Sequence, residues 1–139
     1  MYSFAPCAGI IVFDNDQTVL VATPQGHLSF PKGKRNRGET NLETAWRELG
    51  EETGLTTEHV TLIDDFHIDE QSNRGNVNIR YFIGYLTNPL PNFTFDKEEL
   101  ASVSWYNVNI ALVADKLKDS RKEVLRMAYE KYQSILNSH

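Results

Sequence analysis

The segment from Thr40 to Gly54 predicts one helix with well-defined ends, and this helix is the feature that most restricts the fold. Residues 40–43, TNLE, form a capping-box sequence, in which the Thr40 hydroxyl and the Glu43 carboxylate each accept a backbone N–H. Gly54 suits the left-handed conformation that follows a helix end. Apolar residues recur at three- and four-residue spacing and predict a buried face made of Leu42, Ala45, Trp46 and Leu49.

The same helix carries carboxylates that should repel one another. Glu48 stands three residues before Glu51 and four before Glu52. Like charges at these spacings destabilise a helix by roughly 0.2–0.5 kcal/mol per pair, and the last helical turn disfavours anions. A bound divalent cation would offset this repulsion, because Mg²⁺ binds a few carboxylates together with water and phosphate oxygens. A solvated acidic face is the alternative, and it is the commoner outcome for glutamate-rich helices in general.

The residues before this helix predict a cationic loop. The segment from Pro24 to Glu39 is dense in proline and glycine, which favours a loop. Around Gly33 it carries basic side chains that could meet phosphate oxygens, namely Lys32, Lys34, Arg35 and Arg37. The backbone at a glycine also lets a ligand or metal come close. An acidic helix beside a cationic glycine loop predicts a site for polyphosphate chemistry.

The remaining sequence predicts strands before and after this helix, and further helices near the C-terminal end. Apolar and β-branched runs predict a hairpin from residues 8–13 and 18–23, and strands at 60–68, 77–86 and 102–106. Residues 120–123 predict a second capping box. The helix that it starts would bury Val124, Leu125, Ala128, Tyr132, Ile135 and Leu136, and a shorter helix before it would contain Leu112, Val113 and Leu117. These elements predict an α+β domain with a mixed sheet between helices.

Length, charge and cysteine content exclude several classes. The 139 residues suit one domain spanning residues 1–139. A net charge of −5 argues against a DNA partner, because holding long nucleic acid needs a basic surface. Cys7 is the single cysteine, which excludes an intramolecular disulfide and a cysteine zinc cluster. No apolar stretch approaches the ~18 residues of a membrane span, so no membrane partner and a cytoplasmic location are expected.

Residues 33–55, GKRNRGETNLETAWRELGEETGL, resemble the Nudix box. That pattern is G-x5-E-x7-R-E-U-x-E-E-x-G-U, where U is apolar. Each specified position is filled, by Gly33, Glu39, Arg47, Glu48, Leu49, Glu51, Glu52, Gly54 and Leu55. With common residues at roughly 7% each, a chance match is on the order of 10⁻⁸. The resemblance implies a Nudix-type α/β/α sandwich that hydrolyses a nucleoside diphosphate linked to another group.

The resemblance also assigns roles to residues. It implies Mg²⁺, with Mn²⁺ as an alternative, held by Glu48, Glu51, Glu52 and the backbone carbonyl of Gly33. Glu39 and Arg47 would support the geometry of loop and helix. Glu52 and Glu99 both remain candidates for the general base. Glu99 stands six residues before Trp105, where related Nudix enzymes often place a carboxylate.

Two segments bear on the substrate. Residues 30–34, FPKGK, resemble the approach to the box in mRNA-decapping Nudix enzymes and in diadenosine tetraphosphate hydrolases. Residues 78–86, NIRYFIGYL, resemble the aromatic strand of the diadenosine tetraphosphate hydrolases, where a tyrosine stacks on a base. Tyr81 is the matching residue, with core packing as its alternative role. The predicted phosphate contacts are Lys32, Lys34 and Arg35.

These resemblances favour a dinucleoside polyphosphate as substrate, such as diadenosine tetraphosphate, with an RNA 5′ end as second choice and another nucleoside diphosphate derivative as third. Lys34 stands where the diadenosine tetraphosphate group usually has histidine, which leans towards the decapping-like members. A non-catalytic nucleotide-binding Nudix module is an alternative function, although such domains usually lose box glutamates. A purely structural domain is a third hypothesis, and it predicts no saturable Mg²⁺ or Mn²⁺ effect on the unfolding temperature.

Overall fold

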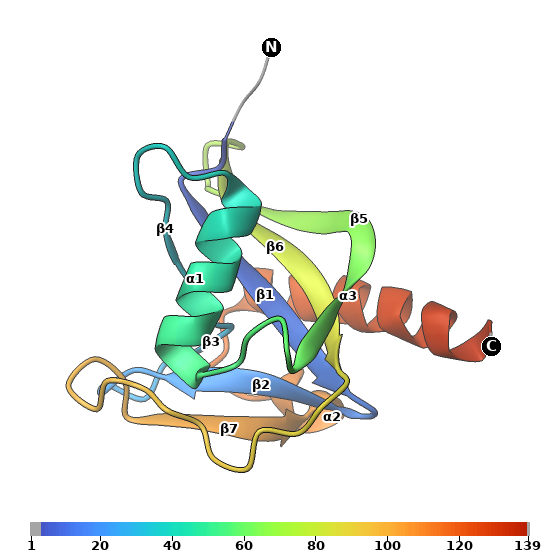
Figure 1. The fold of residues 1–139 in the computed structure, drawn as a ribbon. Helices are drawn as coiled ribbons and strands as arrows, with labels where there is room; N and C mark the ends of the chain where they lie inside the picture. The colour runs from blue at the N-terminus through green and yellow to red at the C-terminus, as the bar shows by residue number, and fades with distance from the viewer. Residues whose placement is uncertain (1–3, 139) are drawn as a thin grey trace.

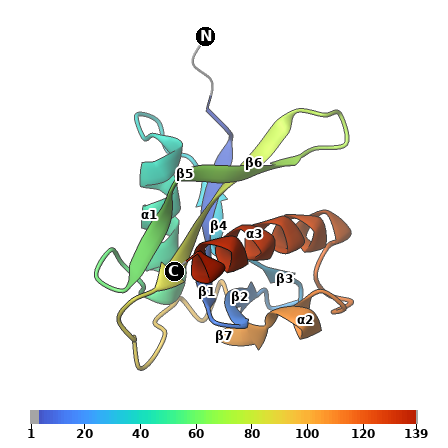
Figure 2. The same ribbon diagram turned by 90° about the vertical axis from the view of Figure 1, so that its right-hand side faces the viewer.

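The computed structural model describes residues 4–138, which form a mixed seven-stranded sheet with helices on both faces (Figures 1 and 2). The strands are β1 (Cys7–Asp14), β2 (Gln17–Ala22), β3 (Leu28–Ser29), β4 (Lys32–Lys34), β5 (Val60–Gln71), β6 (Val77–Leu86) and β7 (Ser102–Asn107). The helices are α1 (Asn41–Thr53), α2 (Val108–Ala111) and α3 (Asp119–Asn137). No helix in this part of the chain is long and apolar enough to cross a membrane.

The sheet runs in the order β3-β2-β1-β6-β5, with β4 paired to β1 and β7 paired to β2. Strands β1 and β6 are parallel, with Cys7 opposite Ile79 and Phe13 opposite Tyr85. The other strand pairs are antiparallel. The predicted α+β fold with a mixed sheet between helices is therefore confirmed.

The predicted hairpin forms from β1 and β2. Asp14 pairs with Gln17, so Asn15 and Asp16 make the turn. Asn15 has φ of 55°, a left-handed conformation that asparagine tolerates better than most residues. Its N–H donates to the hydroxyl of Tyr132 at 3.0 Å, which ties the turn to α3.

Strand β1 is buried on both of its faces. Ile11 and Phe13 belong to the core under α3, whereas Ile10 and Val12 belong to the core under α1. Figures 1 and 2 show these two helices on opposite faces of the sheet. A strand covered on both sides needs apolar residues at consecutive positions, which explains the run from Ala8 to Phe13.

Helix α1 begins and ends as predicted, but its buried face is different. The Thr40–Glu43 capping box forms, and Gly54 has φ of 84°. Leu42 is 38% exposed, and the side chains that α1 buries are those of Asn41, Thr44, Ala45, Leu49 and Thr53. Asn41 is drawn inward because its amide accepts the Ala5 N–H and donates to the Ala5 carbonyl, both at 2.9 Å.

The orientation of α1 determines the environment of its glutamates. At 100° per residue, the centre of the buried face lies roughly 50° from the predicted centre. The rotation turns Glu48 and Glu52 towards the sheet, and both are partly buried. The burial of Asn41 and the burial of these carboxylates follow from the same orientation of the helix.

The loop predicted from Pro24 to Glu39 contains two short strands. Leu28 and Ser29 pair with β2, and β4 pairs with β1 with Gly33 opposite Ala8. Patterns of this length carry no periodicity, so the density of proline and glycine dominated the prediction. Gly33 therefore lies in a strand and not in a turn.

The C-terminal region also differs from the prediction in detail. Helix α3 begins at Asp119, and no side chain caps it. The predicted Ser120–Glu123 capping box does not form, because Lys118 already accepts N–H groups from Arg121 and Lys122. The short helix lies at residues 108–111, where the Asn107 side chain accepts two N–H groups, and not around residues 112–117. Leu136 is 46% exposed, whereas Val124, Leu125, Ala128 and Tyr132 are buried as predicted.

Gly50 provides a test of how α1 is stabilised. A Cβ at this position would meet only the Leu55 carbonyl oxygen, at 3.8 Å. Gly50→Ala should therefore stabilise the protein by about 1 kcal/mol in urea unfolding, because glycine disfavours the helix interior. Gly26→Ala is the matched control. That position is also open, but its φ of 89° makes alanine strained, so a loss of about 1–2 kcal/mol is expected. A destabilised Gly50→Ala would show that the glycine has a packing role.

Candidate active site

The C-terminal half of α1 packs against the short strand β4, and two carboxylates lie at this contact. The Lys32 N–H of β4 donates to Oε1 of Glu52 at 3.0 Å. A Cβ on Gly33 would lie 2.1 Å from Cδ of Glu48, so the carboxylate could not keep its present position beside any other residue. The sequence predicts that a ligand or metal comes close to the backbone at Gly33. In this structure the Glu48 carboxylate occupies that position.

Burial changes the proton affinity of both carboxylates. It raises the pKa of Glu52 from 4.5 to about 7, against the opposing effect of the Lys32 N–H and with a further increase from the charge of Glu48. Burial and the neighbouring Glu51 raise the pKa of Glu48, although Arg47 opposes the change. Without a bound cation, Glu52 therefore keeps its proton to a higher pH than an ordinary carboxyl does.

Glu99 belongs to the same electrostatic cluster. Its charge contributes to the raised pKa of both Glu48 and Glu52. The segment that carries it is fixed at both ends, since the Thr94 N–H donates to the Thr53 carbonyl at 3.0 Å and the Ala101 N–H donates to the Ala22 carbonyl at 2.8 Å. The fold thus brings Glu99 near the glutamates of α1, although 47 positions separate it from Glu52 in the sequence.

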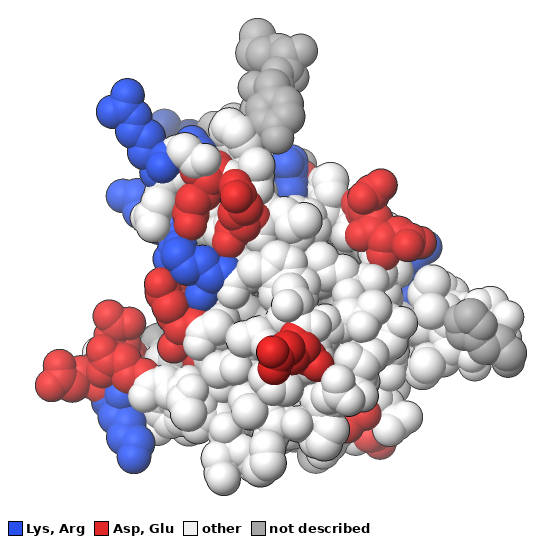
Figure 3. Space-filling view, in the orientation of Figure 1, with Lys and Arg blue, Asp and Glu red and all other residues white. Residues whose placement is uncertain are grey.

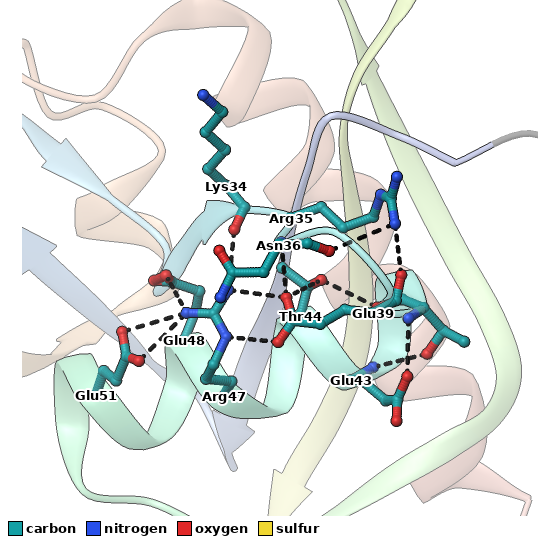
Figure 4. Close-up of polar contacts among 10 residues, drawn as sticks. Lys34, Arg35, Asn36, Glu39, Glu43, Thr44, Arg47, Glu48 and Glu51 are labelled. Carbon is teal, nitrogen blue, oxygen red and sulfur yellow. Dashed lines mark hydrogen bonds and ion pairs between the residues drawn. The ribbon is translucent and has the colours of Figure 1, made fainter.

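Arg47 joins the loop, the strand and the helix (Figure 4). Its Nε donates to Glu39 at 2.6 Å, and its Nη2 donates to the Lys34 carbonyl at 2.9 Å. Its Nη1 donates to Glu48 at 3.0 Å and to Glu51 at 3.2 Å. Arg47 therefore offsets part of the repulsion between Glu48 and Glu51 even without a bound cation.

Glu39 is the second centre of this hydrogen-bond network. It accepts from Arg47, from the Asn36 N–H at 2.8 Å and from the Thr44 hydroxyl at 3.0 Å. These bonds, that from Arg47 above all, lower the pKa of Glu39 to about 2. The sequence pattern does not predict Asn36 or Thr44 as partners of Glu39. Thr44 is buried beside Ala45 in the structure. The predicted apolar face included Leu42 in place of Thr44, so the pattern did not indicate this contact.

The predicted phosphate-binding side chains lie in different places. Lys32 is near enough to Glu52 for its charge to lower the pKa of that carboxyl. The Lys34 ammonium points away from the carboxylates, and Arg35 donates to the Glu39 carbonyl at 2.7 Å on the far side of the loop (Figure 4). The Arg35 guanidinium also lies 4.2 Å from the centre of the Phe4 ring. Figure 3 shows basic and acidic side chains interspersed over α1 and the loop before it.

Tyr81 does not lie where a base could stack on it. It is fully buried, with its ring against Phe30 at 5.2 Å. Its hydroxyl donates to the buried Glu70 at 3.4 Å, and burial raises its pKa well above the usual range. The alternation along β6 turns Tyr81 into the core under α3, so the prediction of a stacking role is wrong in this structure.

The glutamates are not arranged as a finished metal site. Within residues 4–138, no group of three Asp, Glu, His or Cys side chains is close enough together to hold a metal ion as it stands. Glu48 is 13% exposed and Glu51 57% exposed, and both contact Arg47. The donors are nevertheless of the kind that a hard divalent cation prefers, and Glu52 has no cationic side chain within salt-bridge distance among the described residues.

Comparisons with known proteins identify the family and the fold. A model of the NUDIX domain matches residues 3–128. An Ap4A hydrolase of C. elegans, solved as a binary complex, has a TM-score of 0.77 and 24% identity, with 96% of this chain and 99% of that chain covered. A Nudix hydrolase from M. smegmatis has a TM-score of 0.72 and 19% identity, with 97% and 89% covered.

Sequence relatives match over a shorter stretch. RNA pyrophosphohydrolases of Psychromonas ingrahamii and Acinetobacter baylyi are each 44% identical over 62 residues. That stretch is 43% of this chain and 34% and 37% of theirs, so the chain matches about a third of the length of these curated relatives.

The fold and the site together define a class: a mixed sheet between helices, with a glutamate-bearing helix held against a short glycine-containing strand. With the matching domain model and the complete box, the chain belongs to the Nudix hydrolase family.

Proposed function

We propose that this protein is a divalent-metal-dependent pyrophosphohydrolase that cleaves a diphosphate linkage in a nucleoside diphosphate derivative. The observation that carries the proposal is the pair of carboxylates, Glu48 and Glu52, that lie against β4, with Glu99 acting on both through its charge. The carboxylates of the first two are partly buried, and the charge of Glu99 reaches both. Concentrated negative charge of this kind suits a hard cation that also binds phosphate oxygens.

Mg²⁺, or Mn²⁺ in its place, fits the donor set. Glu48, Glu51 and Glu52 would hold it, together with the carbonyl oxygen of Gly33. When bound, the cation would neutralise charge on the oxygens of the scissile diphosphate. Glu52 should gain most from a bound cation, because burial disfavours its charged form and raises its pKa to about 7.

The other residues of the site position groups and move a proton. The Lys32 N–H fixes the orientation of the Glu52 carboxylate. Either Glu52 or Glu99 would accept the proton of the attacking water, which adds to one phosphorus while the bridging oxygen leaves with the other. Lys32, Lys34 and Arg35 would bind phosphate oxygens, with Lys34 turning inward to do so. Glu39 and Arg47 would keep the loop and helix in register.

A dinucleoside polyphosphate such as diadenosine tetraphosphate is the first candidate substrate. The likeness to the C. elegans Ap4A hydrolase extends over nearly the whole of both chains. The buried Tyr81 does not contribute to this choice, because its ring offers no face to a base. An RNA 5′ end is the second candidate, since the sequence relatives that match around the box are RNA pyrophosphohydrolases. A cytoplasmic location fits either substrate.

The test is hydrolysis, with Mg²⁺, of diadenosine tetraphosphate, capped RNA, triphosphorylated RNA, ADP-ribose and 8-oxo-dGTP. We expect diadenosine tetraphosphate to be cut fastest, and expect no cleavage of any compound in EDTA. Faster cleavage of an RNA 5′ end would favour the second candidate, and Lys34→Ala should then raise KM.

A non-catalytic nucleotide-binding module is the alternative function. It predicts calorimetric binding of nucleotides from the same panel with no hydrolysis under Mg²⁺ or Mn²⁺. That result would refute the proposed activity. Absence of a saturable Mg²⁺ effect on the unfolding temperature would refute the metal site as well, because a ligand that binds the folded state stabilises it by mass action.

A further inference from the structure

Gly9 lies in β1, directly opposite Lys32 of β4, and it is buried. A Cβ at Gly9 would lie 2.3 Å from the Pro31 carbonyl oxygen, 2.5 Å from Cβ of Lys32 and 3.0 Å from its Cα. Two of these three atoms belong to the backbone, so moving a side chain would not relieve the crowding. Any side chain at position 9 must push the Pro31–Lys32 segment away from β1.

The displaced segment is the one that contacts the glutamates. β4 has three residues. The Lys32 N–H binds Glu52, and Gly33 lies against the carboxylate of Glu48. Its attachment to β1 continues on both sides, through the Ile10 N–H to the Pro31 carbonyl at 3.2 Å and the Arg35 N–H to the Pro6 carbonyl at 2.9 Å. A shift of β4 at Gly9 would therefore be transmitted to both carboxylates.

We propose that Gly9 is a positioning residue for hydrolysis: the absence of a side chain at position 9 sets how far β4 lies from β1, and so where Glu52 and Glu48 stand. This inference rests on the proposed function. Gly9 touches neither carboxylate and acts only through Lys32 and Gly33. Misplacement of reacting groups by about 1 Å can lower a rate about a hundredfold, so a small movement of β4 is enough to matter.

The test compares Gly9→Ala with Gly84→Ala. Gly84 is the matched control because it is a buried glycine of the adjacent strand β6, and a Cβ there would lie 2.7 Å from Cγ1 of Val60 and 3.0 Å from the Thr61 carbonyl oxygen. Its crowding falls on β5 and not on β4. Both variants should lose stability, but only Gly9→Ala should perturb the site.

Four quantities separate a positioning role from a general loss of stability. They are kcat, KM, the midpoint of a calorimetric Mg²⁺ binding titration, and the exchange rate of the Lys32 amide proton without metal. For Gly9→Ala we expect kcat to fall at least about tenfold with little change in KM. We also expect a raised Mg²⁺ midpoint and faster Lys32 exchange. Gly84→Ala should leave all four near wild-type values.

Wild-type kcat, Mg²⁺ midpoint and amide exchange in Gly9→Ala would overturn the proposal, as would equal losses in both variants. If Gly9→Ala does not fold, the same measurements are made in a Gly50→Ala background, which we expect to be more stable. The amide exchange and Mg²⁺ midpoint need no substrate. They therefore still test Gly9 if the wild-type protein hydrolyses nothing in the panel, an outcome that would count against the proposed function instead.

Discussion

Glu52→Gln is expected to reduce hydrolysis by roughly 10²–10⁴-fold, the range that a positioned acid–base group contributes. The substitution keeps the size of the side chain and an oxygen that can accept the Lys32 N–H bond. It removes the negative charge that the proposed cation and the proposed base function both need. The loss should therefore appear in kcat measured at saturating Mg²⁺ and substrate.

The same substitution should stabilise the metal-free protein at alkaline pH. The pKa of Glu52 is about 7 in the folded protein and 4.5 in the ordinary case, so the folded state binds this proton more tightly. The free energy of unfolding of the wild type therefore falls as pH rises from about 4.5 to about 7, through the contribution of this group. Glutamine carries no such dependence, and the variant should be more stable at pH 8 by about 1–3 kcal/mol.

Urea unfolding in EDTA at pH 5 and pH 8, together with steady-state kinetics, checks both parts. The gain in stability of the variant should be much smaller at pH 5. Mg²⁺ should stabilise the wild type and not the variant, because metal binding needs a deprotonated carboxylate and glutamine has none. Glu130→Gln on α3 is the control, since it makes the same chemical change at an exposed position. A folded Glu52→Gln protein with full turnover would contradict the site assignment.

Arg121→Met is expected to cost about 3–5 kcal/mol of folding free energy, the largest stability effect that we predict. Arg121 Nε donates to Glu70 at 3.2 Å, and the Glu70 side chain is only 2% exposed. Removing the arginine leaves a buried carboxylate whose remaining hydrogen bond in the described structure is the 3.4 Å contact with the Tyr81 hydroxyl. An unpaired buried charge is far more costly than the loss of one favourable contact.

Arg126→Met is the matched control on the same helix. Its partner is Glu123, and the two side chains are 51% and 62% exposed, so the loss should be about 0–1 kcal/mol. Adding Glu70→Gln to Arg121→Met should recover part of the stability, because the buried charge is then gone. Equal effects of Arg121→Met and Arg126→Met in urea unfolding would refute the interpretation of a buried ion pair.

The features that sequence predicted correctly are those determined by neighbouring residues. The ends of α1 follow from Thr40, Glu43 and Gly54, which act within a few positions of the helix. The β1–β2 hairpin follows from two apolar runs around a short turn. The choice of Glu99 as a candidate base came instead from its spacing to Trp105, a family pattern and not local physics, and its role stays a prediction.

The features that sequence missed depend on distant partners. Leu42 has the better apolar side chain, yet Asn41 is buried, because Ala5 offers it a carbonyl and an N–H from 36 positions away. Alternation along β6 shows that neighbours Tyr81 and Phe82 face opposite sides, but it does not show which side a helix covers. Strand β4 was missed for the same reason, because it is defined by its pairing with β1 and not by a pattern in its own three residues.

The parallel pairing of β1 with β6 has a kinetic consequence. These strands form the middle of the sheet, yet Cys7 and Ile79 are 72 positions apart in the chain. Contacts between distant positions form slowly, because the intervening chain must first lose its freedom. Until β6 arrives, the run from Ala8 to Phe13 presents an open, apolar edge on an early hairpin. During synthesis that edge is exposed until residue 86 has left the ribosome, and it is the segment through which nascent chains would associate with one another.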